Sequence, residues 1–158
     1  TMGCDGERKW YSIDMEADIR RFVTDAGMAA TKPVHNPMPD KRLLAKDDRP
    51  LVPDGASTFK SQLMSCMYFG VTLQWDIIHP AVVRLAQLMQ TPTRGAATAL
   101  RRVIAYLATT PSLGIKGYIR SMNTWDFYVD SDHAGDRTVT SRSHTGILLM
   151  MNGVPVFW

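Results

Sequence analysis

Cysteine is scarce in this sequence of 158 residues, which contains only Cys4 and Cys66. These two residues match no metal-ligand spacing and give no disulfide framework, so the composition favours a reducing compartment. Long apolar runs are also absent, because no stretch approaches the roughly 18 consecutive apolar residues of a membrane span. No signal peptide is visible. These absences predict an intracellular protein of the cytoplasm or nucleus with no membrane partner.

Acidic residues are rare in the middle of the chain. Residues 60–125 contain seven Lys and Arg residues and the single acid Asp76, whereas residues 126–136 contain four Asp residues. A basic segment beside an acidic cluster is one way to hold a polyanion while coordinating cations. A solubilising surface is the other interpretation, since the formal net charge is only +3. With 45% apolar residues the chain is globular in composition, and its length suits one domain or parts of two.

Helical periodicity dominates the first two thirds of the chain. Asp14 is placed to cap an amphipathic helix that Gly27 ends. Residues 31–56 are rich in proline and charge, which predicts a linker or a long surface crossing. Apolar residues then recur at helical spacing from Phe59, and a third helix is predicted to begin near Asp76.

A fourth helix is predicted after Thr93, which is a favourable capping residue, and it runs to about Ala108. Arg94, Arg101 and Arg102 project from the side opposite its apolar stripe. The residues predicted to form that stripe are Leu100, Val103, Ile104 and Leu107.

The period changes from helix to strand after residue 111. Residues 113–120 and 125–129 are predicted to pair with each other, and residues 146–151 with 154–158. The second pair flanks Asn152-Gly153, where both residues accept the positive φ of a type I′ turn. The strand that ends at Asp130 is expected beside this hairpin. The Trp residues in these strands are expected in the core.

The apolar run Phe127-Tyr128-Val129 leads directly into Asp130, with Asp132 two residues further on. A carboxylate at the end of a strand is held rigidly and faces solvent, as a hard cation such as Mg²⁺ requires. The pattern suggests a metal site that processes phosphates. Taken alone, it also fits an Asp- and Gly-rich turn.

Several blocks in order carry a resemblance to a known family. Asp-Ser-Asp-His-Ala-Gly-Asp at 130–136 is followed by Arg-Ser-His-Thr-Gly at 142–146 and Gly-Val-Pro-Val-Phe-Trp at 153–158. These blocks resemble the opening of the ribonuclease H domain in copia-type retrotransposon polyproteins. The likeness continues upstream through residues 32–38, 59–63, 91–93 and 101–107.

The resemblance implies four regions. It places the end of a reverse transcriptase-like region at 1–40, a linker at 41–57, a helical connection segment at 58–110 and the first strands of a truncated ribonuclease H-like domain at 111–158. The expected fold class is therefore α+β, in which helical N-terminal and connection segments precede antiparallel strands of an incomplete ribonuclease H-like sheet.

The same resemblance implies that the intact parent copies RNA into DNA and cleaves the RNA of RNA–DNA hybrids with Mg²⁺. Asp130 would be the catalytic carboxylate and a metal ligand, and Asp132 a second ligand. The polymerase Asp pair and the later nuclease carboxylates are not in the sequence, so the chain alone is expected to be inactive. Its expected partners are an RNA–DNA hybrid or another nucleic acid, and the rest of the polyprotein. The alternative is a non-catalytic nucleic-acid-binding or interaction protein derived from such an element. The residues expected to hold nucleic acid are Arg94, Arg101, Arg102, Arg137, Arg142 and Ser143.

Overall fold

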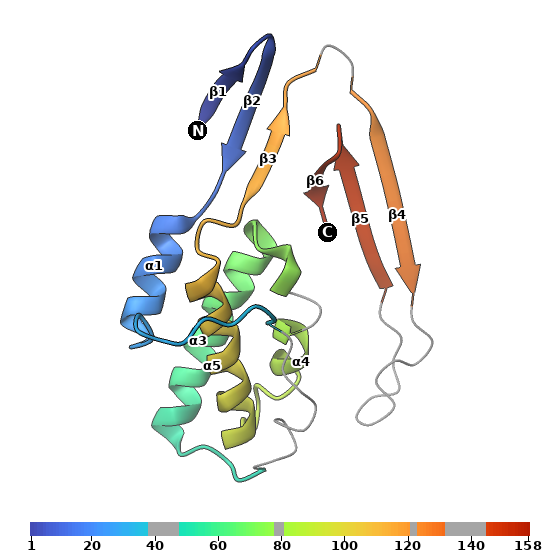
Figure 1. Ribbon diagram of the computed structural model, residues 1–158. Coiled ribbons are helices and arrows are strands. Elements are labelled where there is room, and N and C mark those ends of the chain that lie inside the picture. The colour runs from blue at the N-terminus through green and yellow to red at the C-terminus, as the bar shows by residue number, and fades with distance from the viewer. Residues whose placement is uncertain (38–47, 78–80, 121–122, 132–144) are drawn as a thin grey trace. The chain divides into compact units, whose positions relative to one another are not determined.

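The computed structural model describes residues 1–37, 48–77, 81–120, 123–131 and 145–158. Two compact units make up the chain, one of Thr1–Ile13 with Ile115–Trp158 and the other of Asp14–Gly114. Strands build the first unit and helices the second (Figure 1). The predicted α+β class is thus confirmed.

The helical unit opens with α1 (Glu16–Asp25). The carboxylate of Asp14 accepts a hydrogen bond of 3.2 Å from the Glu16 N–H, which satisfies one of the free donors of the first turn. Gly27 has φ +67° just after the helix, a conformation that favours glycine. The N-cap position itself is Met15, so Asp14 contacts the first turn from one residue before the predicted capping position, whereas the predicted end of the helix is confirmed.

The second helix of this unit, α3 (Pro53–Thr72), begins earlier than predicted and starts inside the segment taken as a linker. Proline at the first helical position explains this, because its missing N–H has no partner there in any case. Where the third helix was predicted, the structure has the 3₁₀ turn Trp75–Ile77 and the short helix α4 (Val83–Ala86). No helix in the described part of the chain is long and apolar enough to cross a membrane.

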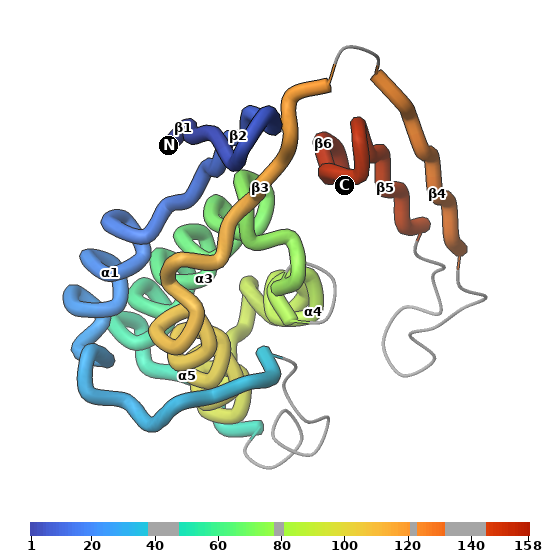
Figure 2. Tube along the Cα trace, turned by 45° about the horizontal axis from the view of Figure 1, so that its top comes forward, coloured from blue at the N-terminus to red at the C-terminus, as the bar shows by residue number. Residues whose placement is uncertain are grey.

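The last helix, α5 (Arg94–Thr109), follows the prediction closely. Thr93 caps it by accepting a hydrogen bond from the Ala96 N–H at 3.2 Å. In Figures 1 and 2, α5 lies beside α1 and α3, and the core of the unit fills the space between these helices. The largest fully buried apolar side chains there are Phe59, Ile19, Leu63, Ile77, Leu85, Leu100, Ile104 and Leu107.

In the strand unit, β1 (Met2–Asp5) and β2 (Arg8–Ile13) form an antiparallel hairpin. Gly6, with φ +59°, is the first residue of its two-residue turn. The free edge of β2 pairs with β3 (Ile115–Tyr118). The predicted pairing of residues 113–120 with 125–129 is therefore wrong. A two-stranded hairpin is marginal in water, so the third strand stabilises the N-terminal one.

The second sheet contains β4 (Trp125–Ser131), β5 (Thr145–Met151) and β6 (Val154–Phe157), in that order. The Asn152-Gly153 turn has φ angles of +55° and +78°, so the predicted hairpin is confirmed, as is its neighbour β4. Trp125 is 58% exposed, so its predicted core position is wrong. The reason is that every residue of β4 is exposed, because its pairing with β5 covers one edge of the strand and neither face.

Candidate functional site

Asp130 lies one residue before the end of β4, as the sequence predicted, and its side chain is exposed. Its backbone pairs with Gly146 of β5, which fixes the position of the carboxylate along the strand. Side chains alternate along a strand, so Asp126 and Tyr128 share its face of the sheet. Asp126 is nevertheless about 13 Å away along the strand, at about 3.3 Å per residue. The two carboxylates therefore cannot share one metal ion.

The other predicted residues of this site, Asp132, Arg137, Arg142 and Ser143, lie outside the described residues. Within the described ranges, no group of three or more His, Cys, Asp or Glu side chains is close enough to hold a metal ion. The carboxylate of Asp130 is an oxygen ligand of the type that Mg²⁺ prefers, but one carboxylate supplies only part of the coordination that the ion requires. The fit to Mg²⁺ thus rests on Asp130 alone among these residues.

The three arginines predicted to bind nucleic acid all lie on α5, which contains no Asp or Glu. Arg94 and Arg101 are exposed. Seven helical residues advance by nearly two full turns, so these two share a side and are about 10 Å apart along the axis. That distance is about three phosphate spacings along one strand of a duplex.

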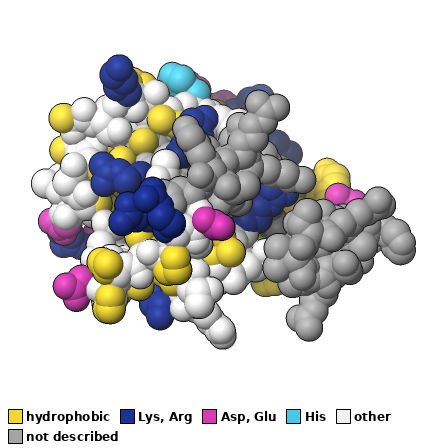
Figure 3. Space-filling view, turned by 90° about the horizontal axis from the view of Figure 1, so that it is seen from below, with side chains coloured by type: hydrophobic (Ala, Val, Ile, Leu, Met, Phe, Trp, Pro, Cys, Tyr) yellow, Lys and Arg dark blue, Asp and Glu magenta, His cyan; other side chains and the backbone are white. Residues whose placement is uncertain are grey.

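Arg102 differs from the other two because it is half-buried and has a partner in the protein. Its Nε donates a hydrogen bond of 3.1 Å to the backbone carbonyl of Asn36. The Val34 N–H donates to the Thr109 hydroxyl at 2.9 Å, so the segment after α1 crosses α5 at two fixed points (Figure 2). Arg102 therefore holds this crossing in place. Figure 3 shows neighbouring Lys and Arg side chains on the face seen from below.

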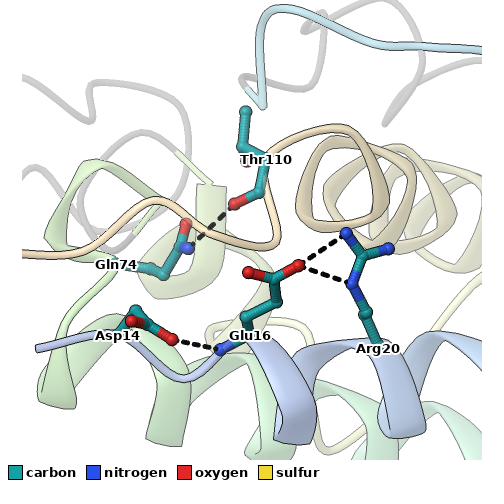
Figure 4. A network of polar contacts seen from close by, with 5 residues as sticks. All are labelled: Asp14, Glu16, Arg20, Gln74 and Thr110. Carbon is teal, nitrogen blue, oxygen red and sulfur yellow. Dashed lines mark hydrogen bonds and ion pairs between the residues drawn. The ribbon is translucent and has the colours of Figure 1, made fainter. Parts of the chain in front are cut away.

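A buried polar cluster of the helical unit had no counterpart in the sequence predictions. Gln74 is completely buried, and its Nε2 donates to the Thr110 carbonyl at 3.1 Å (Figure 4). It also donates to the Leu113 carbonyl at 2.9 Å. Thr110 caps the C-terminal end of α5, where carbonyls have no partner within the helix. Gln74 thus closes that helix end. In the sequence, Gln74 is a single amide between the apolar residues Leu73 and Trp75. This position is the one sequence signal that could have indicated a buried hydrogen-bonding role.

Tyr106 belongs to the same region and donates a hydrogen bond from its hydroxyl to the Asp76 carboxylate. Burial, together with the hydrogen bond and the charge of Asp76, raises the pKa of Tyr106 to about 12. The second carboxylate oxygen of Asp76 is buried and has no hydrogen-bond partner in the described part of the chain. The Tyr106 hydroxyl is therefore protonated near pH 7 and available as the donor to Asp76.

Comparison with known proteins gives two curated relatives, both from Arabidopsis thaliana. The chain is 33% identical over 158 residues to the retrovirus-related Pol polyprotein from transposon RE2, and 32% identical to that from transposon RE1. Each alignment covers 96% of this chain and 10% of the relative, so the chain spans about a tenth of their length. No protein-family model matches the chain, and no solved structure matches it.

An α+β chain with a carboxylate at a strand end and a basic helix is thus similar, over nearly its whole length, to one segment of Pol polyproteins from transposable elements. The resemblance to copia-type retrotransposon Pol polyproteins is confirmed, and the chain corresponds to a fragment of such a polyprotein.

Proposed function

We propose that this chain is the part of a retrotransposon Pol polyprotein that joins its reverse transcriptase and ribonuclease H regions, and that it binds RNA–DNA hybrids through α5. The supporting observation is the side of α5 that carries Arg94 and Arg101, exposed on a helix without acids. Cations spaced along a helix neutralise backbone phosphates without reading sequence, which suits a protein that handles any copied strand.

Binding is tested by fluorescence anisotropy with a labelled RNA–DNA hybrid at low and moderate salt. Arg101→Glu should weaken binding several-fold and reduce the slope of log affinity against log salt by about one to two. Arg21→Glu on α1 is the matched control, since Arg21 is an exposed arginine that pairs with Asp18 at 2.7 Å. Equal weakening by both variants would mean that net charge, rather than α5, governs binding.

The nuclease role of Asp130 is the second part of the proposal. Bound Mg²⁺ would supply the activation of the attacking water and the stabilisation of the leaving oxygen. Asp130 would hold one Mg²⁺ ion, with Asp132 as the other proposed ligand. Because one or two carboxylates seldom hold Mg²⁺ firmly, the 158-residue chain alone should not cleave a hybrid.

Cleavage is tested with a labelled hybrid in Mg²⁺, using this chain and a longer chain that restores downstream polyprotein sequence. Only the longer chain should cut, and Asp130→Asn should abolish cutting. Asp126→Asn is the matched control, because Asp126 lies on the same face of the same strand. Cleavage by the short chain that depends on Asp130 would contradict this assignment. The alternative, a non-catalytic binding protein, is favoured if hybrid binding persists and no extension restores cleavage.

A further inference from the structure

The β1–β2–β3 sheet has one face that combines aromatic rings with cations. Its register sets Trp10 of β2 opposite Tyr118 of β3 and opposite Gly3 of β1. Residues opposite each other in an antiparallel sheet share a face, and alternate residues of one strand do too. Arg8 and Lys116 therefore lie on this face beside the two rings, and Asp5 lies on it opposite Arg8. We call it the Trp10 face.

Gly3 determines how the Trp10 ring lies. A Cβ atom at position 3 would be 2.4 Å from Cζ2 and 2.6 Å from Cε2 of Trp10, so the ring lies directly over this glycine. Only a residue without a side chain lets the indole extend across β1. The ammonium of Lys116 is 4.6 Å from the centre of the ring, a cation–π distance. Trp10 is half-buried and Tyr118 is 40% exposed.

The opposite face of the sheet is packed around Gly117, whereas Lys9 and Ile13 on the same face are exposed. Gly117 is buried there under Tyr11 and Val154, whose Cγ2 would be 2.7 Å from a Cβ at position 117. Val154 is only 4% exposed, so this contact belongs to the core of the unit. The sheet therefore uses part of one face for packing within its own unit and carries the indole ring and the cations on the other face.

We propose that the Trp10 face binds single-stranded nucleic acid by stacking an unpaired base on Trp10 and a second base on Tyr118. Every base has a π face, so aromatic rings accept bases of any sequence. Lys116, beside the Trp10 ring, is placed to take an adjacent phosphate, and Arg8, opposite Asp5, is the second cation on this face. The site goes beyond the proposed function, because it takes single strands and uses no residue of α5.

Relative magnitudes favour the base over the ammonium on the ring. An exposed cation–π contact is worth about two- to fivefold in an equilibrium constant. Stacking one base on an aromatic side chain is worth about five- to 150-fold in affinity. A base that displaces the Lys116 ammonium therefore gains more than is lost, and the flexible lysine stem lets the charge move to a phosphate.

The test compares two labelled single strands of about eight nucleotides, a length within the site size of single-strand platforms. One is oligothymidine and the other has the same phosphates without bases, and oligouridine serves as the RNA version. By fluorescence anisotropy, the 158-residue chain should bind the strand with bases about tenfold more tightly than the abasic strand. Trp10→Ala should remove this preference, and Trp10→Phe should keep most of it.

Lys116→Gln should weaken binding to both strands, and Lys9→Gln is its matched control, because Lys9 is an exposed lysine on the opposite face. Tyr118→Ser should lose the smaller part of the preference, and it decides the question if Trp10→Ala fails to fold. An intact chain that binds both strands equally would overturn the proposal, as would a Trp10→Ala variant that folds and keeps the preference. Arg101→Glu should keep the preference, so the α5 proposal can fail without affecting this one.

Discussion

Replacing Tyr106 with phenylalanine tests the Tyr106–Asp76 contact of the helical unit. The substitution removes one oxygen, the hydroxyl that donates to the Asp76 carboxylate. The other carboxylate oxygen has no partner in the described residues, so Asp76 would lose its one side-chain donor there. Hydrogen bonds to charged groups contribute about 1.5–3 kcal/mol. Since Asp76 is only half-buried, we expect the free energy of unfolding to fall by about 2 kcal/mol at pH 7.

The same contact predicts a loss of stability at alkaline pH. The pKa of Tyr106 is raised to about 12 from its ordinary value of 10.0, chiefly by burial and then by Asp76. The folded chain therefore holds this proton more tightly than the unfolded chain. The stabilisation is complete below pH 10 and is lost as the pH rises towards 12. Two pH units correspond to about 2.7 kcal/mol, enough to cancel the advantage over Tyr106→Phe.

The assay is urea unfolding followed by circular dichroism of the helices, at pH 7, 9, 10 and 11. Other groups that titrate in this range are common to both proteins, so their effects cancel in the difference. Tyr68→Phe is the control, because Tyr68 is 60% exposed and should change stability by less than about 0.5 kcal/mol. The reasoning is refuted if Tyr106→Phe behaves like Tyr68→Phe at pH 7, or if the difference does not shrink above pH 10.

Three further predictions concern single positions. Thr93→Ala should destabilise the helical unit by about 1 kcal/mol in thermal unfolding because it removes the cap of α5, whereas Thr98→Ala, in an exposed position within the helix, should cost little. Gly153→Ala should lower the free energy of unfolding by about 1–2 kcal/mol, because φ at this position is +78°. Gly146→Ala should be tolerated, because the added Cβ would meet only the Asp130 carbonyl at 3.8 Å. Equal losses of stability would argue against the turn geometry. Exposed Cys4 should react with a thiol reagent at once and Cys66 only after unfolding, since burial raises the pKa of Cys66 to about 12; two equally fast thiols would contradict this.

Local signals account for the elements that sequence reasoning predicted correctly. The backbone preference of Asn152-Gly153 is a local signal for its turn, and Thr93 is a local signal for the start of α5. The N-terminal hairpin was missed because β1 has only four residues and β2 begins with two cations, although Gly6 in a two-residue turn was a usable signal. The β2–β3 pairing joins residues about a hundred positions apart, and residues 125–129 were a nearer candidate partner for β3. The apolar pattern of the sequence does not show which of these two segments pairs with β3.

The candidate sites likewise include residues that local sequence features placed correctly and contacts that they could not predict. Asp130 was placed correctly at a strand end because the apolar run before it is a local feature. Helical spacing put Arg102 beside Arg101, but its bond to the Asn36 carbonyl depends on a chain crossing that periodicity does not encode. The Tyr106–Asp76 contact likewise joins positions 30 residues apart. A tertiary contact between two single polar groups produces no periodic pattern in the sequence, so periodicity cannot predict it.

The pairing of Ile13 with Ile115 makes the helical unit an insertion into a sheet. Paired residues on neighbouring antiparallel strands have Cα atoms about 5 Å apart, so the chain leaves the sheet at Asp14 and returns at Gly114 through adjacent points. A turn of a few residues would bridge that gap, and the strands on either side would keep their register. The helical unit is therefore exchangeable as a module. Evolution can lengthen, replace or remove it while the sheet around it stays the same.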